Sequence, residues 1–270
     1  MNSDTPSPIT IPALLARKSR GEKIVALTAY DYLMARFLDQ AGVDMVLVGD
    51  SAAMVCAGYE TTLPLTMEEA LYHNRMARRG VQRALLVADM PFLSYQVSVE
   101  EAMRNAGRFF KEAQVGAVKI EGGAAVVSAV KQMVQAGMPV MGHLGLTPQS
   151  VHKLGGYTVQ ARERIAAEQL LDDALLLQDA GIFALVLEKI PRLVAKSVTE
   201  RLEIPTIGIG AGPDCDGQIL VTHDMLGMFE DFKPRFVRHY ASVANVIRQA
   251  IQQYGADVRA GSFPGDDESY

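Results

Sequence analysis

The feature that most constrains the fold is a unit that recurs along the chain: an amphipathic helix, a glycine, and a short apolar strand that leads into polar residues. Residues 32–41 place apolar side chains at helical spacing, and Gly42 follows where a helix commonly ends in the left-handed conformation. The apolar strand 43–48 then leads to Asp50 and Ser51. A strand this uniformly apolar is expected to be buried on both faces.

Repetition of this unit predicts eight strands. Two of the intervening helices begin with capping boxes, one formed by Thr66 with Glu69 and the other by Ser98 with Glu101. A long helix is expected from about residue 159, and Pro191 suits the first turn of the next helix. The strands are expected over residues 24–27, 43–48, 84–88, 117–120, 138–141, 182–187, 205–209 and 218–221.

Eight buried strands that alternate with helices predict a parallel sheet covered by helices. In a chain of 270 residues, this number fits a closed (β/α)₈ barrel, the TIM barrel, better than an open sheet. Alternation alone does not establish closure, so an open doubly wound sheet is the alternative. We expect one domain over residues 1–270, with flexible tails at 1–8 and 265–270.

Composition and charge disfavour several classes of protein. Hydrophobic residues make up 49% of the chain and charged residues 21%, which is typical of a globular protein rather than a disordered one. The net charge of −5 disfavours binding to nucleic acid. Cys56 and Cys215 form no CxxC pattern, the start lacks the pattern of a signal peptide, and no apolar run is long enough to span a membrane. We therefore expect a cytoplasmic protein without nucleic-acid or membrane partners.

Four acidic residues lie at or just beyond the ends of predicted strands: Asp50, Asp89, Glu121 and Glu188. In a barrel, the carboxyl ends of the strands form the active site, so these side chains are expected to converge. Grouped carboxylates repel one another unless a cation neutralises them, and oxygen ligands favour Mg²⁺, Mn²⁺ or Ca²⁺ over zinc. A single acid after a strand is common in loops. Four acids, each at the carboxyl end of a different strand, predict a metal site.

Two basic residues accompany these acids. Lys119 lies two positions before Glu121, so both side chains point to the same side of one strand. The lysine could form a structural ion pair or hold the carboxylate of an anionic substrate. His143 could be a buried histidine with a purely structural hydrogen bond. The spacing alone leaves these alternatives open.

Other catalytic motifs are weak or missing from the sequence. The glycine-rich stretch at residues 208–212 lacks the full GxGxxG pattern of a dinucleotide site. The sequence contains no Walker A motif and no GxSxG nucleophile elbow. P-loop chemistry and covalent acyl transfer are therefore disfavoured.

Several stretches, in order between about residue 10 and residue 265, carry a family resemblance. They are LTAYD (27–31), VGDS (48–51), ADMPF (88–92), VKIEGG (118–123), GHLGLTPQ (142–149), LE (187–188), IGIGAG (207–212), DGQ (216–218) and SFPG (262–265). Together they resemble the ketopantoate hydroxymethyltransferase family, also called 3-methyl-2-oxobutanoate hydroxymethyltransferase.

The resemblance implies a (β/α)₈ barrel of the phosphoenolpyruvate/pyruvate type, one Mg²⁺ per subunit and a homodecamer. It also implies transfer of a hydroxymethyl group from the co-substrate 5,10-methylenetetrahydrofolate to 3-methyl-2-oxobutanoate, which gives 2-dehydropantoate in the synthesis of pantothenate and coenzyme A. The partners would thus be a small oxo acid and a folate.

The resemblance further implies a role for each strand-end residue. Asp50 and Asp89 would be metal ligands that also contact the substrate, with Glu121 as a further ligand or a partner of the ligands. Ser51 and Lys119 would hold the carboxylate of the oxo acid, and His143 would contact the substrate or product. Glu188 would be the general base. The loops at 59–64 and 92–97 are expected to cover the site.

Two alternative functions remain open on the sequence. One is a Mg²⁺-dependent C–C lyase or mutase on the same barrel, although the KKCGH-like loop of those enzymes does not occur here. The other is a barrel that binds an oxo acid without turning it over.

Overall fold

The structure is a computed structural model that describes residues 7–230 and 234–270. Contacts within the chain define two compact units, Met1–Leu220 and Val221–Tyr270, and each unit is described by itself. The expectation that the whole chain forms one domain stays a prediction. Of the expected tail at 1–8, residues 1–6 lie outside the described residues.

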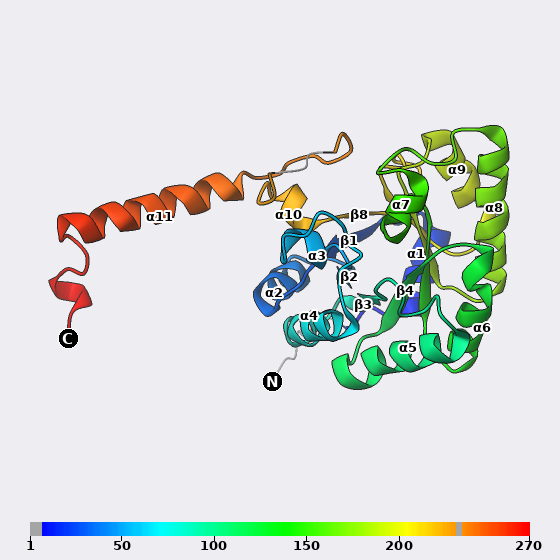
Figure 1. Ribbon diagram of the computed structural model, residues 1–270, viewed down its shortest axis with the longest axis horizontal. Coiled ribbons are helices and arrows are strands. Elements are labelled where there is room, and N and C mark those ends of the chain that lie inside the picture. The colour runs from blue at the N-terminus through cyan, green and yellow to red at the C-terminus, as the bar shows by residue number, and fades with distance from the viewer. Residues whose placement is uncertain (1–6, 231–233) are drawn as a thin grey trace. The chain divides into compact units, whose positions relative to one another are not determined.

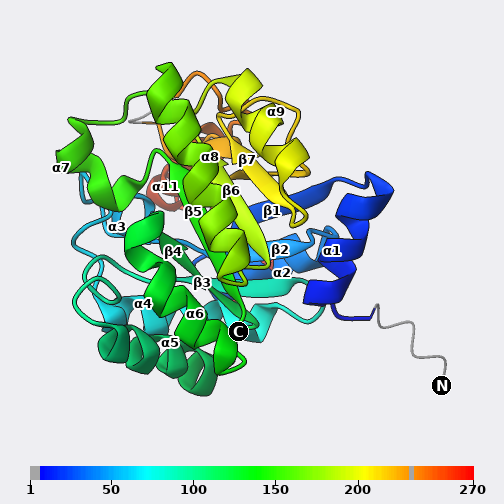
Figure 2. The ribbon, with the colours of Figure 1, turned by 90° about the vertical axis from the view of Figure 1, so that its right-hand side faces the viewer.

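A closed barrel of eight parallel strands forms the first unit (Figure 1, Figure 2). Each strand pairs with the next, and β1 also pairs with β8, where Ile24 lies opposite Gly217. This pairing confirms the predicted barrel and excludes the open sheet. The strands are β1 (Ile24–Thr28), β2 (Met45–Val48), β3 (Leu85–Asp89), β4 (Ala117–Glu121), β5 (Val140–Gly145), β6 (Ala184–Glu188), β7 (Thr206–Ile209) and β8 (Gly217–Leu220).

Helices connect the strands and surround the barrel, as Figure 2 shows for α4, α5, α6 and α8. Two of them, α3 and α7, are single short turns of helix that follow the carboxyl ends of β2 and β5. The helices of this unit are α1 (Ile11–Arg20), α2 (Tyr32–Gln40), α3 (Ala52–Val55), α4 (Met67–Gly80), α5 (Val99–Ala113), α6 (Val127–Gln135), α7 (Val151–Leu154), α8 (Arg164–Asp179) and α9 (Arg192–Arg201), with 3₁₀ turns η1 (Ala124–Val126) and η2 (Pro148–Ser150).

Most helix boundaries follow the local signals, with three corrections. The capping box of Thr66 with Glu69 is confirmed, whereas Ser98 accepts a hydrogen bond from the Glu101 amide, which is one half of the expected box. The helix expected from residue 159 begins only at Arg164, because a left-handed residue at Ala161 (φ 53°) interrupts helical backbone. Pro191 precedes α9 as its N-cap rather than lying in its first turn.

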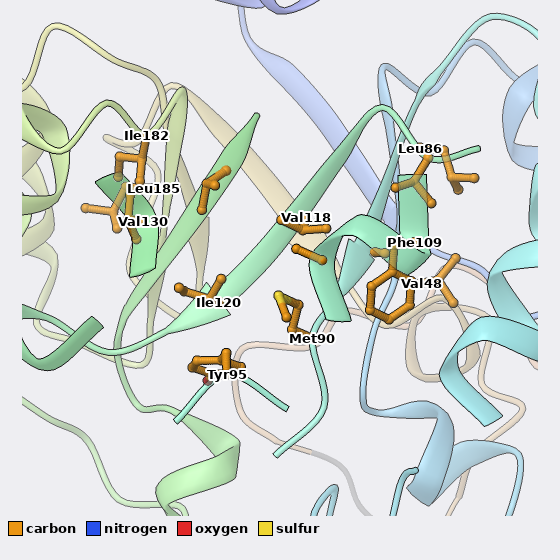
Figure 3. Close-up of a cluster of buried hydrophobic side chains, with 14 of the residues drawn as sticks. Val48, Leu86, Met90, Tyr95, Phe109, Val118, Ile120, Val130, Ile182 and Leu185 are labelled. Atoms are coloured by element: carbon orange, nitrogen blue, oxygen red, sulfur yellow. The ribbon is translucent and has the colours of Figure 1, made fainter. Parts of the chain in front are cut away.

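Alternate residues of each strand belong to two separate hydrophobic clusters. One cluster takes Met45, Leu47, Leu85 and Val87 and fills the barrel interior. The other takes the intervening residues and packs them against the helices; Figure 3 shows Val48 and Leu86 beside Phe109 of α5, with Val118 and Ile120 in the same cluster. The period of two along each strand therefore decides which side chains enter the barrel.

Helix α1 packs its apolar face against the interior cluster. Leu14 is 1% exposed and belongs to that cluster, together with the partly buried Ile9 and Ile11. Arg17 forms an ion pair of 2.7 Å with Asp44, which precedes β2. Because Asp44 lies at the amino end of a strand, α1 closes the barrel at the end opposite the predicted site.

The second unit contains α10 (Thr222–Met225), α11 (Val243–Ala260) and the 3₁₀ turn η3 (Asp266–Glu268). The turn lies inside the stretch 265–270, where we expected a flexible tail, and Gly265 donates its amide hydrogen to Glu268. Among the helices in the described part of the chain, none combines the length and the apolar character needed to cross a membrane.

Candidate active site

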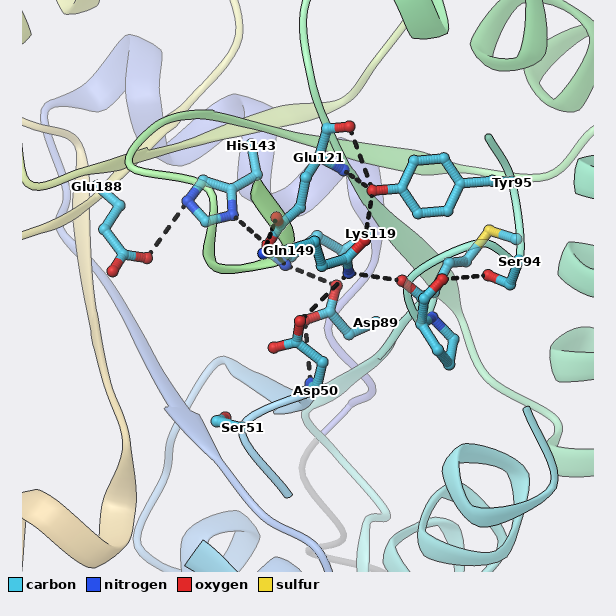
Figure 4. A network of polar contacts seen from close by, with 12 residues as sticks. Asp50, Ser51, Asp89, Ser94, Tyr95, Lys119, Glu121, His143, Gln149 and Glu188 are labelled. Carbon is cyan, nitrogen blue, oxygen red and sulfur yellow. Dashed lines mark hydrogen bonds and ion pairs between the residues drawn. The ribbon is translucent and has the colours of Figure 1, made fainter. Parts of the chain in front are cut away.

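The inward-facing register of the strands continues into the polar residues at their carboxyl ends. Lys119 and Glu121 end β4, Asp89 ends β3, His143 lies in β5, and Glu188 ends β6. The first four are at most 5% exposed, so they are buried within the barrel rather than displayed around it. Figure 4 shows that the structure brings all five together.

Asp50 and Ser51 join this group from the loop after β2. The amide of Asp50 donates to Oδ2 of Asp89 at 3.2 Å, and the Asp50 side chain is buried. Ser51 Oγ lies 2.8 Å from the hydroxyl of Tyr30, which is itself buried. All seven residues predicted for the site therefore lie at the carboxyl end of the barrel.

Lys119 lies between two carboxylates. Its Nζ is 2.6 Å from Oδ1 of Asp89 and 3.5 Å from Oε1 of Glu121. Burial alone would lower the pKa of Lys119, but the charges of Asp89, Glu121 and Asp50 raise it above its ordinary value, so the ammonium stays protonated. The structure shows the ion pair; contact with a substrate carboxylate stays a prediction.

His143 lies between the carboxylates of Glu121 and Glu188. Its Nδ1 is 3.2 Å from Oε1 of Glu121, and its Nε2 is 3.3 Å from Oε2 of Glu188. Burial and the charge of Lys119 lower the pKa of His143, but hydrogen bonding to Glu121 and Glu188 raises it to about 9. A pKa of this value favours the imidazolium at neutral pH, whose charge lies within ion-pair distance of both carboxylates.

Two buried residues that were not among the predicted site residues, Gln149 and Tyr95, form hydrogen bonds with the acidic residues of the site. The backbone N–H of Gln149 donates to Oε2 of Glu121 at 3.1 Å, and the side-chain Nε2 of Gln149 donates to Oδ2 of Asp50 at 3.2 Å. The hydroxyl of Tyr95 donates to Oε1 of Gln149 at 2.8 Å and accepts from the Glu121 amide at 3.1 Å. Each residue had a signal in the sequence: Gln149 lies in the stretch 142–149 that carries the family resemblance, and Tyr95 lies in the loop 92–97 that was expected to cover the site.

The donor set fits a hard divalent cation. Burial raises the pKa of Asp50, and the negative charges of Asp89 and Glu121 raise it further. A cation bound here would neutralise this concentration of negative charge. No group of three or more His, Cys, Asp or Glu residues in the described chain has an arrangement that could hold a metal. Mg²⁺ is commonly bound through one or two carboxylates, with substrate and water as its other ligands, so Asp50 and Asp89 suffice for this mode. Both oxygens of Glu121 have protein partners, and so do both oxygens of Asp89, so these contacts do not separate Glu121 from Asp89 as a ligand.

Comparison with known proteins identifies relatives along the whole chain. The family model for ketopantoate hydroxymethyltransferase matches residues 8–266. The 3-methyl-2-oxobutanoate hydroxymethyltransferase of Prosthecochloris aestuarii is 59% identical over 266 residues, and that of Chlorobaculum parvum is 57% identical over 266 residues. Each match covers 97% of this chain and 96% of the relative.

Solved structures with the same fold are more distant in sequence. A 2,3-dimethylmalate lyase of the PEP mutase/isocitrate lyase superfamily has a TM-score of 0.63 at 18% identity, covering 98% of this chain and 93% of that one. A phosphonopyruvate hydrolase solved with oxalate and Mg²⁺ has a TM-score of 0.61 at 14% identity, covering 96% and 92%. These likenesses confirm the barrel class, whereas the full-length sequence matches decide the family. The chain belongs to the ketopantoate hydroxymethyltransferase family.

Proposed function

We propose that the protein transfers the one-carbon unit of 5,10-methylenetetrahydrofolate to 3-methyl-2-oxobutanoate, giving 2-dehydropantoate and tetrahydrofolate. The C3–H bond of the oxo acid and both C–N bonds to the methylene carbon of the folate break, and that carbon forms one C–C bond to C3 and one C–O bond to the oxygen of water. The proton from C3 and one proton from water end on the two folate nitrogens. The observation that carries this proposal is the group of buried acids at the carboxyl end of the barrel, in a chain of this family. With this activity the protein would act in the synthesis of pantothenate and coenzyme A.

Asp50 and Asp89 would hold Mg²⁺ and face the oxo acid. When bound, Mg²⁺ would supply Lewis-acid stabilisation of the negative charge that develops as the C3 proton leaves. Gln149 and the Asp50 amide orient the two carboxylates, which supports their assignment as ligands. Glu121 is held by His143 and Gln149, and we assign it the role of a partner that orients its neighbours.

Ser51 and Lys119 would bind the carboxylate of the oxo acid. Ser51 lies directly after Asp50, and its hydroxyl is held by Tyr30 at 2.8 Å. The protonated amine of Lys119 supplies positive charge within an acidic site, which favours an anionic substrate. These two side chains would orient the substrate with C3 toward Glu188.

Glu188 would be the general base that removes the C3 proton. It ends β6, and its carboxylate is the most exposed of the site acids, with 15% of its side chain accessible. Nε2 of His143 lies 3.3 Å from Oε2 of Glu188, so an imidazolium there would pair with that oxygen. The other oxygen can then accept a proton from a substrate held by Asp50 and Ser51.

Mass spectrometry of products tests the activity directly. Purified protein is incubated with 3-methyl-2-oxobutanoate, methylenetetrahydrofolate and Mg²⁺, with an EDTA control and with Glu188→Gln as a matched variant. A product one hydroxymethyl unit heavier, formed only with Mg²⁺ and lost in the variant, is the expected result.

Absence of product would lead to a second measurement, deuterium exchange at C3 of the oxo acid in heavy water. Exchange without product would support removal of the C3 proton and would refute methylenetetrahydrofolate as the one-carbon donor. Absence of both would favour a lyase, a mutase or a non-catalytic barrel. The homodecamer implied by the family is tested separately by sedimentation of the purified protein.

A further inference from the structure

The loop at residues 155–161 is fastened to the end of strand β6. It joins α7 to the segment before α8, and Gly155, Gly156 and Ala161 all have left-handed backbone. The amide of Gln160 donates to the carbonyl of Lys189 at 2.9 Å, and Nζ of Lys189 donates to the carbonyl of Tyr157. Two hydrogen bonds therefore hold this loop to a single residue.

Lys189 directly follows Glu188, the proposed base. Its φ of 47° is left-handed, a conformation uncommon for residues other than glycine, and its amide donates to the carbonyl of Ile209 in β7. Such backbone outliers cluster at functional sites, where the surrounding structure must hold them in place. Here the left-handed turn directs the lysine side chain back to the loop.

The phenol of Tyr157 extends from this attachment toward strand β2. Its hydroxyl donates to Sδ of Met54 at 3.8 Å, and Met54 lies in α3, which begins directly after Ser51. In a closed barrel of eight strands in sequence order, β2 and β6 lie on opposite sides. A residue tied to the end of β6 that also reaches the helix after β2 must cross the carboxyl end of the barrel.

The electrostatic surroundings of the phenol agree with this placement. Burial, followed by the negative charges of Asp50 and Glu188, raises the pKa of Tyr157. The hydroxyl is therefore protonated at neutral pH and is a hydrogen-bond donor. The sulfur of Met54 is a weak acceptor, so transfer of this donor to a carboxylate or ketone oxygen would be favourable.

We propose that Tyr157 is a further substrate-binding residue, which lies across the bound oxo acid between Asp50 and Glu188 and donates a hydrogen bond to it, and that Lys189 is its positioning residue. The inference rests on the proposed function, because that function defines the oxo acid and the base. It adds a third cover to the two loops expected from the sequence, and this one is attached next to the base itself.

Equilibrium calorimetry with 3-methyl-2-oxobutanoate and Mg²⁺ tests the contact without requiring turnover. Tyr157→Phe removes the hydroxyl alone and is expected to weaken oxo-acid binding about tenfold, the effect of one hydrogen bond to a charged group. The same variant should raise KM for the oxo acid and leave KM for the folate unchanged. Tyr72→Phe is the matched control, because Tyr72 is 61% exposed on α4.

A second set of variants tests Lys189. Lys189→Met keeps the length of the side chain but removes its donor, and should raise KM for the oxo acid without lowering the melting temperature by more than about 2 °C. Lys189→Arg keeps a donor and should restore much of the affinity. A purely structural lysine would instead change the melting temperature and leave KM unaltered.

The outcomes separate this inference from the proposed function. If wild-type protein binds the oxo acid but forms no product, the proposed function fails, and the calorimetric comparison still decides the role of Tyr157. If Tyr157→Phe binds the oxo acid as wild type does, or loses affinity for the folate instead, the inference is overturned. If wild-type protein does not bind the oxo acid, both fail.

Discussion

Replacement of Gln149 by leucine tests whether the buried amide holds the two acids in place. Its Nε2 donates to Oδ2 of Asp50 at 3.2 Å and to the carbonyl of Met90 at 2.9 Å, and its Oε1 accepts from Tyr95 at 2.8 Å. The substitution keeps approximately the same volume and removes every one of these side-chain bonds. At 6% exposure, water cannot readily replace them.

The expected cost follows from the groups that are left without a partner. Asp50 Oδ2 and the Met90 carbonyl each lose a donor, at about 1–3 kcal/mol apiece, and the new apolar side chain offsets part of this. We expect Gln149→Leu to lower the free energy of unfolding by about 3 kcal/mol. Because Gln149 orients a proposed metal ligand, the affinity for Mg²⁺ should fall about tenfold or more.

Urea unfolding followed by circular dichroism measures the first effect, in EDTA and at fixed protein concentration. Tyr95→Phe should cost about 1 kcal/mol alone, and the double variant should show a coupling of about 1 kcal/mol through the shared bond. Gln96→Leu is the matched control: it also contacts Oε1 of Gln149, at 3.1 Å, but it is exposed. Its effect should stay within about 0.5 kcal/mol.

Calorimetric titration with Mg²⁺ measures the second effect. Unchanged metal affinity in a folded Gln149→Leu protein would show that the amide does not position Asp50 for the metal. Additive costs in the cycle with Tyr95→Phe would show that the two side chains act independently. Either result refutes this part of the reasoning.

Four further predictions address the site, the barrel and the second unit. Glu188→Gln should abolish turnover and C3 exchange while leaving oxo-acid binding intact by calorimetry, and near-normal turnover would exclude it as the base. Asp50→Asn and Asp89→Asn should each raise the Mg²⁺ concentration needed for half-maximal activity at least about tenfold, and an unchanged titration would remove that residue from the ligand set. Leu14→Ala should cost about 3 kcal/mol in urea unfolding, since Leu14 is 1% exposed against the barrel interior, and a cost below about 1 kcal/mol would contradict its place in the core. Burial raises the pKa of Asp224 to about 6, so stability should fall as pH rises from about 4 to 6, by about 1–2 kcal/mol after allowance for its partial exposure; Asp224→Asn should remove that slope, and an unaltered slope would assign it to other groups.

The strands and the acids at their ends could be predicted from local patterns. A strand with a period of two sends alternate side chains to one side, so the spacing of Lys119 and Glu121 places both on the same face wherever the strand lies. In a closed barrel of parallel strands, the carboxyl ends of all the strands lie at the same end of the barrel. Asp89 and Glu188, which each end a strand, therefore lie in the same region. The barrel and the grouping of the predicted site residues therefore followed from the sequence.

The partners of those acids could not be predicted in the same way. Gln149 bonds to Asp50 across 99 positions of sequence, and Tyr157 reaches Met54 across 103. Both residues lie in short turns and loops after β5, where no repeating period determines side-chain direction. The start of α8 at Arg164 rather than near residue 159 could not be predicted either, because the left-handed backbone of this loop interrupts the helical spacing of apolar residues.

The sequence by itself determined the number, order and phase of the strands, because hydrophobic periodicity and helix caps act over only a few residues. The tertiary structure alone decided that Lys119 pairs with Asp89, that His143 lies between two carboxylates, and that the loop carrying Tyr157 is tied to Lys189. Those contacts depend on closure of the barrel, which fixes the distances between strand ends to within hydrogen-bond length. The protonation states of the buried site follow from the same closure, since burial and neighbouring charge set them together.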